Sequence, residues 1–284
     1  MSAASGPVNF LDRYVRDVGL DAAWRSQPLP WSELLEKILD KQTEVNPLLF
    51  SPWINHSCFR KDWLHCADQG IGADFIGNFL WLLMGKMAGR TQKDRCRALW
   101  LRIQQWYEAN EEVEDKLETL VPTMIKGQKK SPKLRASGAQ ARALIPFTVE
   151  ASGKWLDDDD PVELAAKSAA IHINECYAAL SVAKETWQSQ LLLNSVSFAH
   201  QYVALSDHQG DGKLWKIKPK LHLFLELCAE GTKPSLIWGY RDEDFGGSFA
   251  RFGRRRGGIL SAASTSRTVL ASFRMQPMVR LMEF

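Results

Sequence analysis

The apolar residues of this chain recur mostly at the spacing of an α-helix. After two prolines, residues 31–39 place apolar side chains three and four positions apart, and this spacing predicts a brief helix. The same pattern predicts helices within 73–106. Residues 161–206 contain neither Gly nor Pro and predict one or two long helices. The chain is therefore predicted to be mainly helical.

Two short segments depart from the helical pattern. The run SCFRKDWL, residues 57–64, alternates in character and is typical of a strand that leads into a helix starting near Gly72. A second strand or turn is predicted at 236–240. The expected fold class is therefore mainly α, or α+β dominated by helices.

Breaks in the pattern divide the chain into four predicted parts. They are an N-terminal helical segment at 1–50, a strand and helix at 51–90, a long helical part at 91–210, and a C-terminal part with a basic tail at 211–284. Within the helical part, the acidic run 157–160 precedes Pro161. Carboxylates favour a helix N-terminus and proline fits its first turn, so this run predicts a capped helix start.

Composition limits the class of protein. The chain has 36 Lys and Arg against 33 Asp and Glu, and a net charge of +3 implies neither nucleic acid nor membrane as a partner. Its five cysteines are odd in number and include no C-x-x-C pair, which favours reduced thiols in an intracellular protein, nuclear or cytoplasmic. No secretion signal or membrane-spanning stretch is evident, so the expected protein is soluble.

Basic residues form local clusters despite the small net charge. We predict phosphate contacts for them, with a solvated helix face as the alternative. The predicted nucleic-acid-binding residues are Lys129, Lys130, Lys133, Arg135, Arg142, Lys216, Lys218, Lys220, Arg254 and Arg255.

Two acidic segments are candidates for metal binding. Asp62 lies near the end of the predicted strand, in DWLH, a place where a carboxylate can be presented to a divalent ion. Its alternative role is to cap the following helix, with His65 packed locally. The three consecutive acidic residues Asp242, Glu243 and Asp244 either ligate a metal ion or form a solvated turn. No P-loop, G-x-G-x-x-G, H-E-x-x-H or G-x-S-x-G motif is present.

In combination, these segments resemble the CACTA (En/Spm-like) DDE transposases. DWLHCADQGI is similar to the segment of their second acid, D-x-(M/L)-H followed by a Gly-Val pair, with Asp62 as the acid. Trp238, Glu243 and Gly247 reproduce the W-x-x-x-x-E-x-x-x-G spacing around the family's third acid. In the family an H-x-x-x-H segment precedes this acid, and here Glu226 stands in place of its second His. KLRASGAQAR is similar to the basic segment of the family's helical insertion.

The resemblance implies a partial RNase H-like core with a large helical insertion. It also implies that Asp62 and Glu243 are the catalytic and metal-binding residues and that Mg²⁺ is the cofactor. The family's first acid has no counterpart among the 61 residues before Asp62. Two-metal phosphoryl transfer needs that carboxylate as well, so the chain alone is expected to be catalytically inactive.

The leading interpretation is a transposase-derived protein that binds DNA. It is expected neither to bind a membrane nor to need a small-molecule cofactor. Two alternatives stay open. One is a metal-dependent nuclease or integrase that uses Asp62 and Glu243. The other is a helical protein that binds other proteins.

Overall fold

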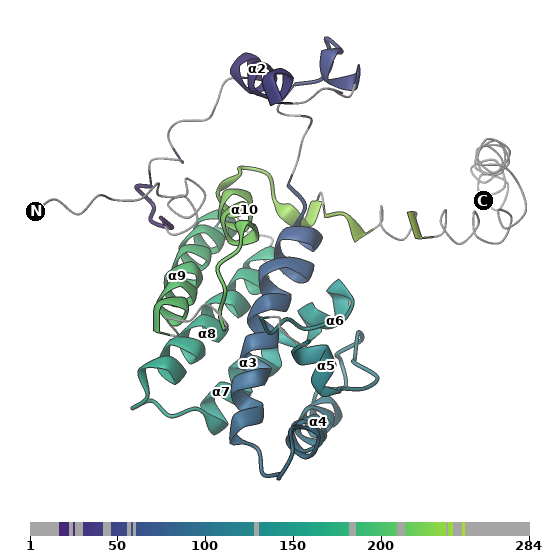
Figure 1. Ribbon diagram of the computed structural model, residues 1–284, viewed down its shortest axis with the longest axis vertical. Helices are drawn as coiled ribbons and strands as arrows, with labels where there is room; N and C mark the ends of the chain where they lie inside the picture. The colour runs from purple at the N-terminus through teal and green to yellow at the C-terminus, as the bar shows by residue number, and fades with distance from the viewer. Residues whose placement is uncertain are drawn as a thin grey trace, which may run out of the picture. The chain divides into compact units, whose positions relative to one another are not determined.

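The computed structural model describes only part of the chain. The described residues are 17–22, 25, 31–41, 47–55, 58, 61–127, 131–181, 186–208, 214–236, 238–240 and 246–247. The chain divides into two compact units, Met1–Ile237 and Trp238–Phe284, and each is considered by itself. In the described part, all regular structure is helical (Figure 1). The mainly helical fold class is confirmed.

The helical elements whose bounds the structure describes lie in the first unit. They are α2 (Trp31–Lys41), η2 (Pro47–Phe50), η4 (Leu64–Gly72), α3 (Ala73–Lys86), α4 (Gln92–Ala109), α5 (Pro122–Ile125), α6 (Gly138–Ala143), α7 (Ile145–Trp155), α8 (Pro161–Ser181), α9 (Trp187–His208), α10 (Pro219–Ala229) and η5 (Pro234–Leu236). The helices predicted within 31–39, 73–106 and 161–206 are confirmed. Across the described residues, no helix combines the length and apolarity that crossing a membrane requires.

The strand predicted at 57–64 is wrong for every residue of it that the structure describes. In 57–64, the π-helix η4 begins at Leu64 and no described position is a strand. Trp63 and Leu64 are 1% and 2% exposed, whereas consecutive residues of a strand point to opposite faces. Two adjacent buried side chains suit the start of a helix that is packed on several sides. At 236–240, where a strand or a turn is predicted, Leu236 ends the 3₁₀ helix η5, Gly239 lies in a turn, and no described residue is a strand.

Helix α3 lies at the centre of the first unit. Phe75, Ile76, Phe79 and Leu80 are fully buried, and their consecutive positions show that α3 is covered on several sides. Figure 1 shows α3 between α9 and α10 on one side and α4, α5 and α6 on the other. Helix α10 packs on α9 and η4, so part of the predicted C-terminal segment contributes to this same core.

An aromatic cluster joins α3, α9 and α10. The ring centroids of Phe75 and Phe198 are 5.6 Å apart, and those of Phe198 and Phe224 are 6.1 Å apart, both in edge-to-face geometry. Such pairs add about 0.5–1.5 kcal/mol beyond the burial of their area. The cluster fixes the position of α10 against α3, which matters for the lysines that lie just before and within α10.

Side chains cap the starts of α8 and α6. Asp160 Oδ1 accepts hydrogen bonds from the amides of Val162 (2.8 Å) and Glu163 (3.2 Å), which confirms the predicted capped start of α8. At α6, Ser137 and Gln140 form a reciprocal capping box. The basic segment before α6 thus ends at a defined residue, Ser137.

The five cysteines are unpaired and differ in exposure. Cys58 is exposed, and the other four are buried, namely Cys66, Cys96, Cys176 and Cys228. Burial raises the pKa of all four buried thiols, because the low-dielectric interior disfavours the thiolate. These four thiols behave as small apolar core residues.

Candidate functional site

The helix that leads into α3 is bent. Residues Leu64–Gly72 form the π-helix η4, and Gly70 has φ −96° and ψ −113°, outside the helical region. Hydrogen bonds of an α-helix run from residue i to i+4, and a π-helix with a bend interrupts that pattern. Carbonyl groups near the bend are therefore available to donors from outside the helix. Stretches of this kind occur often at functional sites.

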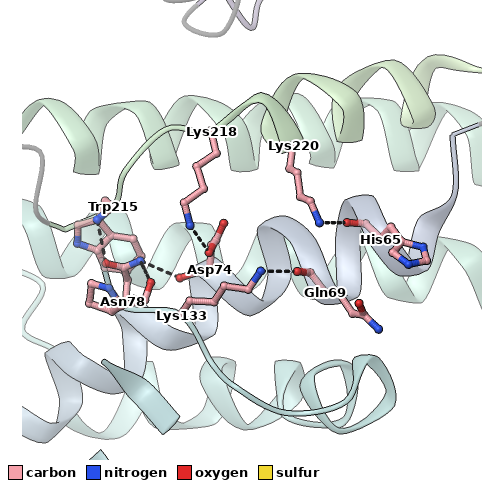
Figure 2. A network of polar contacts seen from close by, with 9 residues as sticks. His65, Gln69, Asp74, Asn78, Lys133, Trp215, Lys218 and Lys220 are labelled. Atoms are coloured by element: carbon pink, nitrogen blue, oxygen red, sulfur yellow. Dashed lines mark hydrogen bonds and ion pairs between the residues drawn. The ribbon is translucent and has the colours of Figure 1, made fainter. Parts of the chain in front are cut away.

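Two lysines from distant parts of the chain donate to these carbonyls. Lys220 Nζ lies 2.8 Å from His65 O, and Lys133 Nζ lies 2.7 Å from Gln69 O. The two acceptors are four residues apart and lie on the same side of the helix. Figure 2 shows both side chains reaching the bent helix, Lys220 from α10 and Lys133 from the segment before α6.

The segment 131–135 is held by its backbone on both edges. The amide of Leu134 donates to Ala73 O at 2.9 Å. The amides of Lys133 and Arg135 donate to carbonyls of α5, both at 2.8 Å. Because alternate amides point in opposite directions in extended chain, this pairing fixes the segment between α3 and α5. Lys133 is thereby presented to the bent helix by a backbone that is hydrogen-bonded to both neighbouring helices.

A buried ion pair lies next to the two lysine contacts. Lys218 Nζ is 2.6 Å from Asp74 Oδ1, and the Asp74 side chain is 2% exposed while that of Lys218 is 31% exposed. The charges of Asp74 and Lys218 also act electrostatically on Lys133. Burial lowers the pKa of Lys133, Lys220 and Lys218 lower it further, and Asp74 opposes them. Lys218 thus pairs with Asp74, while Lys133 and Lys220 donate to carbonyls nearby. This network contains three ammonium groups and one carboxylate.

Asn78 connects the two lysine-bearing segments through α3. Its Nδ2 donates to Asp74 O (2.8 Å) and Pro132 O (3.2 Å), and its Oδ1 accepts from the amide of Trp215 (2.8 Å). Trp215 has φ 49°, a left-handed conformation that is unusual for a bulky residue. The buried Trp215 side chain and the Asn78 hydrogen bond hold that conformation, and they set the direction of the chain toward Lys218.

The structure brings together three of the predicted phosphate-contacting residues, Lys133, Lys218 and Lys220. Arg135 and Lys216 lie on the same two segments and are exposed. Arg142, on α6, has its Cζ 5.9 Å from the ring centroid of Tyr177. The remaining members of that prediction lie outside the described residues, namely Lys129, Lys130, Arg254 and Arg255.

Asp62 has the geometry of a helix cap. Its carboxylate accepts hydrogen bonds from the amides of Leu64 (3.2 Å) and His65 (3.1 Å) and also contacts His65 Nδ1. This is the local arrangement expected of the capping alternative. Glu243 lies outside the described residues, so the predicted approach of Asp62 to Glu243 stays a prediction. Among the described residues, no group of three or more His, Cys, Asp or Glu side chains is arranged to hold a metal ion.

The sequence interpretation missed Asp74 and Asn78, which organise the lysines. A signal was present, because these two polar residues stand four positions apart in the otherwise apolar helix ADFIGNFLWLL. That spacing places them on one face. A polar pair on one face of a buried helix indicates a buried polar network.

No family model matches the chain, and no curated protein or solved structure matches it either. The candidate site is accordingly defined by its own geometry. It is a half-buried, positively charged surface with ammonium groups fixed by backbone carbonyls and by Asp74. Such a surface attracts anions through both charge and hydrogen bonding.

Proposed function

We propose that this chain binds nucleic acid by contacting the phosphate groups of the nucleic-acid backbone. The contacts are made by a basic surface formed by Lys133, Lys218 and Lys220 together with Arg135 and Lys216. The observation that carries the proposal is the convergence of two separate basic segments on one side of η4 and α3. The contacts of Lys133 and Lys220 with the helix span 64 and 155 residues of sequence.

A polyanion suits this surface better than a small neutral ligand does. The net charge of the chain is only +3, so the positive field is local to the basic surface. Each phosphate contact releases condensed counterions, which makes such binding favourable at low salt. Arg135 and Lys216 are exposed, and no described residue forms an ion pair with either. Their charges are available to a ligand.

The resemblance to CACTA transposases supports DNA as the partner, because DNA is the substrate of those enzymes. Descent from them, an RNase H-like core, and Mg²⁺ bound by Asp62 and Glu243 are proposals that rest on sequence motifs alone. Binding at the basic surface depends on none of them. We propose DNA binding without catalysis by the chain alone.

Salt-dependent DNA binding tests the proposal. Fluorescence anisotropy of a labelled DNA duplex is measured with the full chain between about 50 and 200 mM NaCl. We expect the logarithm of the association constant to fall linearly with the logarithm of salt concentration. The double variant Arg135→Gln/Lys216→Gln should reduce the slope by about 1 for each phosphate that is no longer neutralised.

A matched control removes the same two charges elsewhere. Lys93 and Arg97 are exposed on α4, and Lys93→Gln/Arg97→Gln should leave the slope unchanged. Absence of binding at about 50 mM NaCl would overturn the proposal, because non-specific binding is strongest at low salt. Equal effects of the two double variants would assign the binding to general charge rather than to the basic surface.

A further inference from the structure

The three lysines of the basic surface have different partners. Lys218 faces the carboxylate of Asp74, which offsets its charge. Lys133 and Lys220 donate instead to the uncharged carbonyls of Gln69 and His65. A carbonyl satisfies one N–H group and leaves the ammonium charge uncompensated. The hydrogen-bond partners of Lys133 and Lys220 therefore carry no negative charge, in contrast to the partner of Lys218.

Both of these ammonium groups keep hydrogen-bonding capacity. An ammonium group has three donors, and the contact with a carbonyl uses one of them. Lys220 also approaches the bend in the helix closely, since a Cβ atom at Gly70 would lie 3.1 Å from its Cδ. Lys133 is half-buried, and burial lowers its pKa; the charge of Asp74 opposes this lowering, and the charge of Lys220 adds to it. The two like charges thus interact across the bend.

We infer that Lys133 and Lys220 together bind one phosphate group beside Gly70. This inference rests on the proposed nucleic-acid binding, because it identifies one phosphate contact within the basic surface. The anion accepts the free N–H donors of both lysines and removes the repulsion between them. At this one phosphate site Lys218 and Asp74 act as positioning residues, since their ion pair holds the start of α10 against α3.

Phosphate is the ligand class that fits these groups. Its several oxygens accept hydrogen bonds from two separate cations at once, and lysine is a common phosphate-binding residue that acts as a point charge. The group can belong to the backbone of a nucleic acid or be a terminal or free phosphate. The chemistry of recognition is the same in each case, so the experiment contains separate arms for these sources.

The test uses the full chain and three probes. Inorganic phosphate is titrated calorimetrically, and a labelled oligonucleotide is compared with and without a 5′-phosphate by anisotropy. We expect Lys133→Gln and Lys220→Gln each to weaken phosphate binding about tenfold, because each removes a charge-assisted hydrogen bond. Lys220→Arg keeps the charge and should retain binding.

Thermal melting shows whether each variant is folded. Lys133→Gln retains an N–H donor for the carbonyl of Gln69, and Lys220→Gln changes a side chain that is only half-buried. If Lys133→Gln fails to fold, Lys220→Gln and Lys220→Arg still decide the question. Acetate titrated over the same range is the comparison ligand, and binding of acetate as tight as that of phosphate would overturn the phosphate assignment.

The outcomes separate this inference from the proposed function. If DNA binds with the predicted salt slope and both glutamine variants behave as wild type toward every probe, the inference is overturned and the proposed function stands. If phosphate binds and the variants lose it while DNA does not bind, the proposed function is overturned and the phosphate site stands. A preference of wild type for the 5′-phosphorylated oligonucleotide, absent from the variants, supports the site and assigns it to terminal phosphates. Equal binding of both oligonucleotides, weakened in the variants, supports it and assigns it to the backbone.

Discussion

Gly77 gives Lys133 the room to lie against α3. A Cβ atom at position 77 would be 2.4 Å from the Cα atom of Lys133, a distance that requires the backbone to move. Gly77→Ala should therefore destabilise the protein by about 1–3 kcal/mol, as overpacking does in other cores. Urea denaturation measures this, and DNA affinity should fall with it, since Lys133 is displaced.

The matched control for this substitution lies in the same helix. Nothing lies within 4 Å of a Cβ atom built at Gly85, so Gly85→Ala adds helix propensity without a clash. We expect Gly85→Ala to be neutral or stabilising by up to about 1 kcal/mol. Similar stabilities of the two alanine variants would show that segment 131–135 does not lie as close to α3 as the structure has it.

Breaking the buried ion pair should be costly. Lys218→Met leaves the carboxylate of Asp74, whose side chain is 2% exposed, without its ammonium partner. A loss of about 1–3 kcal/mol is expected, moderated by the partial exposure of Lys218. The double variant Asp74→Asn/Lys218→Met should recover part of that loss. Chemical denaturation of the single and double variants yields the coupling energy between the two positions.

An exposed ion pair serves as the comparison. Lys154 Nζ lies 2.5 Å from Glu150 Oε1 on α7, with the two side chains 58% and 45% exposed. Because solvent screens such a pair, Lys154→Met should change stability by no more than about 0.5 kcal/mol. Equal losses for Lys154→Met and Lys218→Met would contradict the burial of Asp74.

The capping box of α6 should contribute measurably to stability. Ser137 Oγ accepts a hydrogen bond from the Gln140 amide at 3.2 Å. Ser137→Ala removes that acceptor and should cost about 1 kcal/mol, whereas Ser137→Asp keeps an acceptor and should stay near wild type. Thermal melting of the two variants compares them. An equal loss of stability in both variants would mean that the Ser137 cap does not account for the loss.

Acid should weaken the ion pairs that Glu226 on α10 forms with Lys61 and His222. Burial raises the pKa of Glu226, but hydrogen bonding to His222 and the charge of Lys61 outweigh it, so the pKa lies below its ordinary value of 4.5. A depressed carboxyl pKa contributes stability above the unfolded value, and this stability is lost as pH falls through the folded pKa. The advantage of wild type over Glu226→Gln should therefore shrink as pH falls below about 4.5. A difference that stays constant from pH 7 to pH 3 would contradict this.

The helices can be predicted from the sequence because their apolar spacing is long and regular. The strand at 57–64 cannot be distinguished from a helix start, because alternation over a few residues fits both. Asp62 illustrates the same limit. Its capping contacts are local and belong to the alternative that the sequence offers, while its proposed relation to Glu243 depends on residues outside the described part.

The convergence of the lysines lies beyond sequence reasoning. The basic segments can be recognised separately, but the contact of Lys218 with Asp74 spans 144 residues and depends on how α10 packs. Nothing in the local pattern encodes that packing. The polar pair Asp74 and Asn78 is the available clue, because isolated polar residues in a buried helix need partners.

The unequal exposure of the cysteines provides a built-in reporter of folding. A thiol-reactive dye added to the native chain should modify one sulfur, at Cys58, because the other four are enclosed and hold their protons. Labelling of the four buried sulfurs then requires the first unit to open. Mass spectrometry of a timed labelling reaction would therefore report how fast the first unit opens. A fluorophore at Cys58 would likewise leave the basic surface chemically untouched.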